Sequence, residues 1–375
     1  MIAWAITRLL EGHDLTRAEA RDVMGVIMSG EATPAQMGGF LVALRFKGET
    51  AHEIAGCAEA MRAHVLAVKP TRDDLVDTAG TGGDNAHTFN ISTAAALVAA
   101  AAGAGVAKHG NRAVSSSSGS ADVLEALGFS LDLPPERIEQ SIDELGFGFL
   151  FAPAHHPAMR HAAPVRRELA TRTVFNVLGP LTNPAGARAQ VVGVFSAELV
   201  PTIADVLAQL GARRAYVVHG AGGIDELSPA GENVVCEVVD GAVVERVIDP
   251  LDLGVARCDP AALRGGTPAE NAETIRAIFS GVDGAQADAV LINAAGAIAA
   301  SGHAEDLREG LETARTAVAS GAAADRLDAL MAFSRAHERA HAPGRGTREN
   351  REVPPGTAPP VPSGAVDNIE GDGTV

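Results

Sequence analysis

Three segments of the sequence combine residue types that could do chemistry, and a Gly-rich stretch is the first. It reads DTAGTGGD from Asp77 to Asp84, and Asn90, Ser92 and Thr93 follow where an Ala-rich helix is predicted to begin. Glycines let backbone N–H groups close around an anion, and a helix N-terminus adds partial positive charge. The stretch is therefore predicted to bind phosphate; the alternative is a tight turn with a Ser or Thr cap. It is not the dinucleotide pattern G-x-G-x-x-G, because its second and third glycines are adjacent.

A second polar loop follows the next apolar segment along the chain. It reads KHGNRAVSSSSGSADVLEALG from Lys108 to Gly128, with a basic cluster before four serines and a helix start after them. Basic side chains and the amides of a helix start are the donors that a diphosphate requires. We predict a second phosphate site here, whereas four serines alone would indicate only a flexible loop. Within this loop His109 is predicted to have a packing or positioning role.

The third segment carries two adjacent carboxylates, Asp225 and Glu226. They lie in HGAGGIDELSP, from His219 to Pro229, directly after an apolar strand. Mg²⁺ binds to one or two carboxylates and completes its shell with water and substrate phosphates. Surface loops carry many such pairs, but the position at a strand end, in a chain with two predicted phosphate loops, favours a magnesium site.

Arg166 and Arg167, on a helix that follows His155 and His156, are the remaining candidates. One guanidinium could bind a substrate carboxylate, and the alternative is a solvated basic helix end. The two histidines are not predicted to bind metal, since neighbouring positions on a helix diverge by about 100°.

The elements that position these residues change character near residue 71. Before it the chain is predicted to be helical, with Ile2, Ile6, Leu9 and Leu10 on one face of the first helix. Capping boxes mark the later helix starts at Thr16/Glu19, Thr33/Gln36 and Thr50/Glu53, and another at Thr267/Glu270. After it, strands at 75–78, 106–109, 190–195 and 215–219 alternate with helices, and a hairpin spans 234–247. This alternation predicts an α/β fold with a mostly parallel sheet.

The predicted organisation has two domains and a tail. Residues 1–70 form a helical domain, on which a later helical segment at about 156–186 packs, and residues 71–342 form the α/β domain. Residues 343–375 contain six Pro and six Gly among 33 residues and no Leu, Phe, Met, Trp or Tyr, so the tail is predicted to be disordered.

Composition excludes several classes of function. The 375 residues carry 30 Lys and Arg against 47 Asp and Glu, a net charge of −17 that disfavours nucleic acid as a partner. Three widely spaced cysteines indicate neither a disulfide framework nor a zinc site, which fits a reducing cytoplasm. The first residues lack the features of a signal peptide, and the longest apolar stretch, 93–107, is predicted to be a buried helix and strand rather than a membrane span.

Taken in order, the motifs resemble those of the anthranilate phosphoribosyltransferases, which join anthranilate to phosphoribosyl pyrophosphate in tryptophan biosynthesis. The resemblance covers residues 1 to about 340 and includes RRELATRTVFNVLGPLTNPA from Arg166 to Ala185. It implies a small helical domain plus a larger α/β domain, in the nucleoside phosphorylase-like phosphoribosyltransferase fold, and a homodimer formed through the helical part. Ser117 differs, since relatives often carry Lys there, and the 343–375 tail has no counterpart.

The resemblance also implies roles for individual residues. Anthranilate would contact Gly80, Asn111 and Arg166, and Mg²⁺, at two ions per subunit, would be held by Ser92, Asp225 and Glu226. The phosphoribosyl pyrophosphate site would comprise Gly80, Gly83, Asp84, Thr88, Asn90, Ile91, Ser92, Thr93, Lys108, His109, Gly110, Asn111, Arg112, Ser115, Ser116 and Ser120.

The implied reaction is displacement of pyrophosphate from C1 of the ribose by the aromatic amine. Asn111 and Arg166 would position the amine. No dedicated general base is evident, and none is needed for the attack, because an arylamine is neutral at pH 7 and already carries its lone pair.

Two alternatives are a pyrimidine nucleoside phosphorylase, which has a similar fold, and a catalytically silent relative that binds nucleic acid. The KHGN motif at 108–111, the run from Arg166 to Ala185 and the Asp225-Glu226 pair disfavour the first. The net charge and the intact set of metal and phosphate residues disfavour the second.

Overall fold

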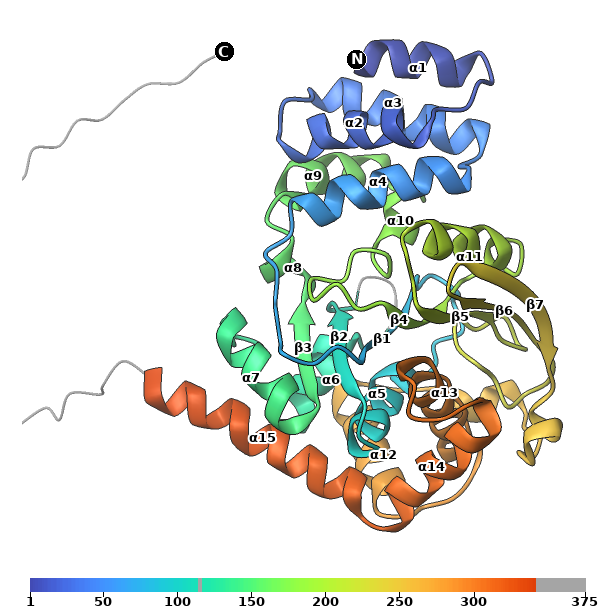
Figure 1. Cartoon of the computed structure of the whole chain (residues 1–375). Helices are drawn as coiled ribbons and strands as arrows, with labels where there is room; N and C mark the ends of the chain where they lie inside the picture. Colours follow the sequence, from blue (N-terminus) through green and yellow to red (C-terminus); the bar gives the residue numbers. More distant parts are fainter. Residues whose placement is uncertain (114–116, 342–375) are drawn as a thin grey trace, which may run out of the picture. The chain divides into compact units, whose positions relative to one another are not determined.

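The computed structural model describes residues 1–113 and 117–341 (Figure 1). The predicted site residues Ser115 and Ser116, residue 342 and the predicted tail at 343–375 lie outside the described residues. The helical domain contains α1 (Ile2–Leu10), α2 (Arg17–Met28), α3 (Pro34–Lys47) and α4 (Ala51–Ala63).

A seven-stranded sheet is the centre of the larger domain in the described residues, with the order β3-β2-β1-β4-β5-β6-β7. Its first five strands in this order are parallel, and β6 and β7 add an antiparallel hairpin. The strands are β1 (Leu75–Gly80), β2 (Gly105–Gly110), β3 (Phe147–Phe151), β4 (Ala189–Gly193), β5 (Arg214–His219), β6 (Asn233–Val239) and β7 (Ala242–Ile248). The predicted α/β class, with a small helical domain and a mostly parallel sheet, is confirmed.

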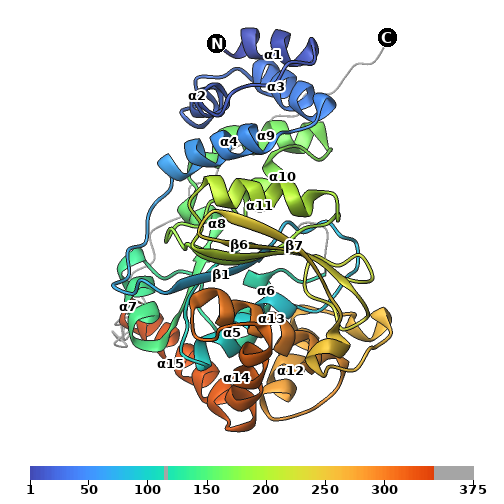
Figure 2. The ribbon, with the colours of Figure 1, turned by 45° about the vertical axis from the view of Figure 1, so that its right-hand side comes forward.

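Helices cover both faces of this sheet (Figures 1 and 2). A hydrophobic core lies on each face. Neighbouring side chains of β4 point to opposite faces, so Val191 belongs to the first core, with residues of α5 and α13, and Val192 belongs to the second, with residues of α4 and α11. Both α5 and α13 are rich in Ala and buried on nearly all sides, as expected of central helices. The helices after β1 are α5 (Ile91–Ala101), α6 (Ser120–Leu127), α7 (Pro135–Leu145), α8 (Ala152–His155), α9 (Met159–Leu169), α10 (Phe175–Leu178), α11 (Leu199–Gln209), α12 (Pro268–Phe279), α13 (Ala285–Ser301), α14 (Leu307–Ala319) and α15 (Ala322–His341), with short 3₁₀ turns η1 (Pro250–Leu253) and η2 (Pro260–Leu263).

The second core continues from the sheet into the helical domain. It includes residues of α1 to α4 together with residues of α9, α10 and α11. Helix α9 packs against α2 and α3, and α10 packs against α4. The segment that carries Arg166 therefore lies between the helical domain and the carboxyl edge of the sheet, while the exact domain boundaries stay a prediction.

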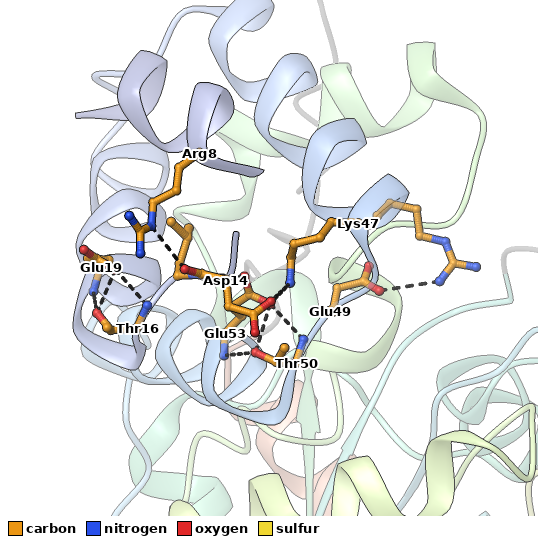
Figure 3. Close-up of polar contacts among 10 residues, drawn as sticks. Arg8, Asp14, Thr16, Glu19, Lys47, Glu49, Thr50 and Glu53 are labelled. Atoms are coloured by element: carbon orange, nitrogen blue, oxygen red, sulfur yellow. Dashed lines mark hydrogen bonds and ion pairs between the residues drawn. The ribbon is translucent and has the colours of Figure 1, made fainter. Parts of the chain in front are cut away.

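The starts of the first helices show how local sequence sets their limits. All four predicted capping boxes are present, with Thr16, Thr33, Thr50 and Thr267 as N-caps. At Thr50 the partner Glu53 is fully buried and also accepts from Leu15 N–H (3.0 Å) and Lys47 Nζ (2.8 Å) (Figure 3). This carboxylate joins the start of α4 to the loop before α2 and to the end of α3.

Two details differ from the sequence expectations. Leu10 is 64% exposed and does not share the buried face of α1, which is formed by Ile2, Ala5 and Leu9. Strand β3 was not predicted, because its run FGFLF is uniformly apolar and buried, without the alternation that marks a half-buried strand. None of the helices in the described part of the chain is long and apolar enough to cross a membrane.

Candidate active site

The carboxyl ends of β1, β4 and β5 lie at one edge of the sheet, where the predicted loops begin. Gly80 at the end of β1 pairs with Gly193 at the end of β4. A Cβ on Gly193 would fall 1.4 Å from the backbone oxygen of Asp225, and one on Gly80 would fall 2.2 Å from its carboxylate. The two glycines therefore allow the loop after β5 to cross β4 and reach the Gly-rich loop, Gly80–Asp84.

Three carboxylates gather where these loops meet. One oxygen from each of Asp84, Asp225 and Glu226 lies within 4.8 Å of the others. Gly82 N–H donates to Asp225 Oδ2 (2.7 Å), and Asp225 N–H donates to Asp84 Oδ2 (3.3 Å). The sequence placed Asp84 with the phosphate ligands and not with the metal ligands. A carboxylate inside a predicted phosphate loop needs a cation between itself and the anion, and this is the signal that could have placed Asp84 among the candidate metal ligands.

The electrostatics of this acidic cluster fit a divalent cation. Burial, followed by the charge of Asp84, raises the pKa of Asp225 to about 7. Burial, followed by the charge of Asp225, raises the pKa of Glu226 well above its usual value. Glu226 Oε2 is buried and has no hydrogen-bond partner among the described residues. Mutually repelling carboxylates with an unpartnered buried oxygen are the oxygen donors that Mg²⁺ prefers.

Ser92 and Lys108 lie next to this acidic cluster. Lys108 is 1% exposed, and its Nζ donates to Thr78 O (2.6 Å) and to Ser92 Oγ (3.4 Å). Burial lowers the pKa of Lys108 to about 8, although the charges of Asp77, Glu226 and Asp225 oppose this shift. A cavity of about 10 Å³ lies between Ser92 and the acid pair and is lined by Thr78, Ala79, Ser92, Val191, Gly193, Asp225, Glu226 and Asn293.

The two predicted phosphate loops are joined through Asn90, which precedes α5. Its Nδ2 donates to Ser118 O (3.0 Å), and its Oδ1 accepts from Ser118 Oγ (2.9 Å) and Asn271 Nδ2 (2.9 Å). Farther along the second loop, Ser120 Oγ donates to Asn111 O (3.2 Å), and a Cβ on Gly110 would fall 2.2 Å from Ser120 Oγ. These contacts bring Asn90, Gly110, Asn111 and Ser120 into one connected region.

Four other predicted phosphate ligands differ in how far their side chains are free; Thr93 Oγ1, for example, is buried and has no hydrogen-bond partner among the described residues. The guanidinium of Arg112 pairs with Asp122 (3.1 Å) and Glu125 on α6. The side chains of Ile91 and Thr93 are buried, and Thr88 forms an isolated backbone bridge with Arg264. Ile91 could thus contact an anion only through its backbone, and the roles of these residues stay predictions.

His109 is buried in a network behind the second loop. Its Nδ1 lies 3.1 Å from Gly179 O, which can only accept, so Nδ1 carries the proton and His109 Nε2 accepts from His156 Nε2 (3.2 Å). Burial is the main cause that lowers the pKa of His109 to about 3 and that of His156 to about 4. His109 N–H donates to the fully buried Asp77 carboxylate (3.1 Å), so this histidine is a packed, neutral group.

The predicted anthranilate residues come from three elements. Gly80 ends β1, Asn111 follows β2, and Arg166 lies in the last turn of α9. The Arg166 guanidinium stacks over Phe175 at 5.1 Å from the ring centre, and burial lowers its pKa. Asn111 Oδ1 accepts from Arg112 N–H (2.8 Å), and the described residues show no hydrogen bond between Asn111 and Arg166.

Sequence reasoning missed two buried amides that support the site. Asn293 on α13 is 3% exposed, and it donates to Leu227 O (2.7 Å) and accepts from Leu227 N–H (2.9 Å), next to Glu226. Asn271 near the start of α12 is also 3% exposed and holds Asn90. A polar residue inside an otherwise apolar helix, as in VLINAAGA around Asn293, is the signal that could have identified the first.

With this geometry established, comparison with known proteins identifies the family. Residues 72–324 match the α/β domain of a glycosyl transferase family, and residues 5–65 match the helical bundle domain of a glycosyl transferase family. An anthranilate phosphoribosyltransferase of Anaeromyxobacter dehalogenans is 56% identical over 332 residues, which are 88% of this chain and 98% of that protein. The chain belongs to the anthranilate phosphoribosyltransferase family. A family member from Moorella thermoacetica is 50% identical over 89% of this chain and 98% of its own length.

Solved structures of the family have the same fold. The anthranilate phosphoribosyltransferase of Thermus thermophilus superimposes with a TM-score of 0.84 at 50% identity, covering 88% of this chain and 99% of that one. The Saccharomyces cerevisiae enzyme in complex with PRPP and Mg has a TM-score of 0.82 at 28% identity, covering 89% of this chain and 98% of that one. The phosphoribosyltransferase fold expected from the sequence motifs is confirmed.

Proposed function

We propose that this chain transfers the phosphoribosyl group of phosphoribosyl pyrophosphate to the amine of anthranilate. The products are N-(5-phosphoribosyl)anthranilate and pyrophosphate, and the reaction belongs to tryptophan biosynthesis. The observation that supports this most strongly is the convergence of the Gly-rich loop, Lys108 and the acidic cluster at one sheet edge, in a member of this family. These groups suit a substrate that carries a diphosphate with bound cations.

The metal ligands in this proposal are Asp84, Asp225 and Glu226, with Ser92 beside them. The proposed complement is two Mg²⁺ per subunit, and the Mg-bound yeast relative supports the identity of the metal. When bound, Mg²⁺ neutralises the charge that develops on the leaving pyrophosphate.

The remaining residues bind and orient the two substrates. N–H groups of the Gly-rich loop and of the α5 start donate to phosphate oxygens, and the Lys108 ammonium adds a positive charge. The Arg166 guanidinium pairs with the carboxylate of anthranilate, and Asn111 orients the amine toward C1 of the ribose. The yeast relative in complex with 4-fluoroanthranilate supports an aromatic amine as the acceptor.

We also propose that the chain forms a homodimer through its helical domain. Helices α1 and α3 pack against each other and expose Trp4 (46%), Val42 (46%) and Phe46 (83%). We call these three residues the α1–α3 apolar surface. Exposed large apolar groups on adjacent helices are typical of a protein interface. The three cysteines are free in the structure, which is compatible with the proposed cytoplasmic location.

A direct assay tests the function. Purified protein is mixed with phosphoribosyl pyrophosphate, Mg²⁺ and anthranilate, and the loss of anthranilate fluorescence is followed. We expect Mg²⁺-dependent turnover that EDTA abolishes. A parallel reaction with a pyrimidine nucleoside and inorganic phosphate tests the phosphorylase alternative, and turnover only in that reaction would overturn the proposal.

A further inference from the structure

Arg172 lies in the segment between α9 and α10 and has no role in the site as described so far. Helix α9 ends at Leu169, its C-cap Ala170 turns the chain with a φ of +46°, and Arg172 follows two residues later. Its half-buried guanidinium donates through Nη2 to Gly83 O in the Gly-rich loop. It also stacks over the ring of Phe195, with the guanidinium carbon 4.0 Å from the ring centre.

Glycine at position 83 favours this contact. Gly83 has a φ of +79°, and a Cβ there would fall 3.0 Å from Arg172 Nη2. Elsewhere in the loop, Thr81 N–H donates to Gly193 O (2.9 Å), and Phe195 N–H donates to Thr81 Oγ1 (3.2 Å). Arg172 and the end of β4, which are joined through Phe195, therefore both hold the Gly-rich loop.

This hydrogen bond also sets the direction of the next amide. In a trans peptide the C=O and the following N–H point in opposite directions. Holding Gly83 O toward Arg172 therefore turns the N–H of Asp84 away from Arg172. Asp84 belongs to the acidic cluster, so the same peptide links the loop amides to a proposed metal ligand.

The charge of Arg172 is not neutralised by a carboxylate in the described part of the chain. Its contacts there are one backbone carbonyl and one aromatic ring, and it forms no ion pair. A rigid, weakly hydrated guanidinium with free N–H groups next to a phosphate loop also raises the local positive potential.

We propose that Arg172 is a positioning residue for phosphoribosyl pyrophosphate, which it serves by holding the Gly83–Asp84 peptide in the orientation that binds the diphosphate. The proposal rests on the proposed function. The segment from Arg166 to Arg172 then contacts both substrates' sites, with Arg166 at the anthranilate carboxylate and Arg172 at the loop for the sugar diphosphate. The two arginines should therefore differ in which substrate their variants affect.

The test compares Arg172→Ala and Arg172→Lys with the wild type, with Arg160→Ala on the exposed side of α9 as the matched control. For Arg172→Ala we expect the KM for phosphoribosyl pyrophosphate, and its Kd by calorimetry with Mg²⁺ and no anthranilate, to rise about 10-fold or more. The KM for anthranilate and the Tm should change little. Arg172→Lys keeps the charge but not the planar stacking on Phe195. Its KM and Kd for phosphoribosyl pyrophosphate should therefore be closer to those of the Ala variant than to those of the wild type.

Chemical rescue separates a specific role from a general structural one. Guanidinium ion at non-denaturing concentration should restore part of the phosphoribosyl pyrophosphate affinity of Arg172→Ala and leave Arg160→Ala unchanged. An unchanged KM for phosphoribosyl pyrophosphate, equal rises in both KM values, or a lower Tm with no rescue would overturn the role of Arg172. Absence of turnover in the wild type would instead overturn the proposed function, and the calorimetric comparison would still decide the role of Arg172.

Discussion

At the residue scale, the site depends on side chains whose ionisation is set by burial. Asp225 accepts a hydrogen bond from Gly82 N–H and lies against two other carboxylates. Its raised pKa and that of Glu226 reflect charges that are costly without a cation. A bound divalent cation would remove this cost.

We therefore predict that Asp225→Asn combined with Glu226→Gln abolishes activity while preserving the fold. Turnover should fall about 100-fold or more, since the charge stabilisation by a metal is worth several kcal/mol. In EDTA the Tm of the double variant should equal or exceed that of the wild type, because two repelling buried charges are gone. Steady-state assays and thermal unfolding measure the two effects. Activity at the wild-type level would show that these residues are not the metal ligands.

The buried pair of His109 and His156 predicts a pH effect on stability. Both pKa values are lowered in the folded state, so the unfolded chain binds protons first as the pH falls below 6.5. Their contribution to the free energy of unfolding is complete above pH 6.5 and is lost as the pH falls toward about 4. Asp77, whose pKa is raised to about 6 mainly by burial, changes stability in the opposite sense, so the wild-type curve alone is not diagnostic.

His156→Gln isolates this effect, because Gln can donate to His109 Nε2 but does not titrate. When the pH is lowered from 7.5 to 4.5, the free energy of unfolding of the variant should rise relative to that of the wild type by on the order of 2 kcal/mol. Urea unfolding at both pH values measures the difference, with the exposed His13→Gln as control. A difference that does not depend on pH would show that His156 has the same pKa in the folded and the unfolded chain.

At the scale of elements, the helical domain is held together by capping and by Glu53. This fully buried carboxylate accepts from the backbone N–H groups of Leu15 and Thr50 and from Lys47 Nζ (Figure 3). It thereby connects three helices that come from separate parts of the first sixty residues. Removing it leaves the amides of Leu15 and Thr50 without their acceptor, and it leaves Lys47 with Asp14 (2.6 Å) as its other partner.

We predict that Glu53→Ala lowers the free energy of unfolding by about 3–5 kcal/mol, the cost of breaking a buried ion pair from one side. Urea unfolding is the measurement, and Glu31→Ala, at an exposed position in the same domain, is the control and should change stability by less than about 0.5 kcal/mol. A loss below about 1 kcal/mol for Glu53→Ala would mean that water replaces the carboxylate at no great cost.

At the scale of the whole molecule, the α1–α3 apolar surface is a feature that the fold of the single chain does not bury. Most other apolar residues of this domain are buried in a core shared with α9, α10 and α11. An exposed aromatic residue such as Phe46 is a common anchor of protein interfaces.

We predict that Phe46→Asp weakens the proposed homodimer by about 10- to 100-fold and shifts the population toward monomer. Light scattering after size-exclusion chromatography measures the mass. Leu251→Asp, at an exposed apolar position in η1, is the control and should leave the mass unchanged. If Phe46→Asp and the wild type have the same mass over a wide concentration range, the interface lies elsewhere or the chain is a monomer.

The sequence by itself determined what depends on near neighbours in the chain. Capping boxes at Thr16, Thr33 and Thr50 marked helix starts because both partners are three residues apart. Glycines at 80, 82 and 83 and the Asp225-Glu226 pair indicated an anion loop and a metal loop, because backbone freedom and ligand chemistry are properties of the residues themselves.

Only the tertiary structure decided which of these local features meet. Asp84 and Asp225 are 141 residues apart, and they touch because β1, β4 and β5 lie side by side with their carboxyl ends at one edge. The loop after β5 can cross β4 only because residue 193 is glycine. This requirement is visible only in the folded chain, where the backbone of Asp225 lies against Gly193. The contact of Arg172 with Gly83 likewise joins a segment packed on the helical domain to a loop of the sheet. Local patterns carry no information on strand order, and strand order is what brings these residues together.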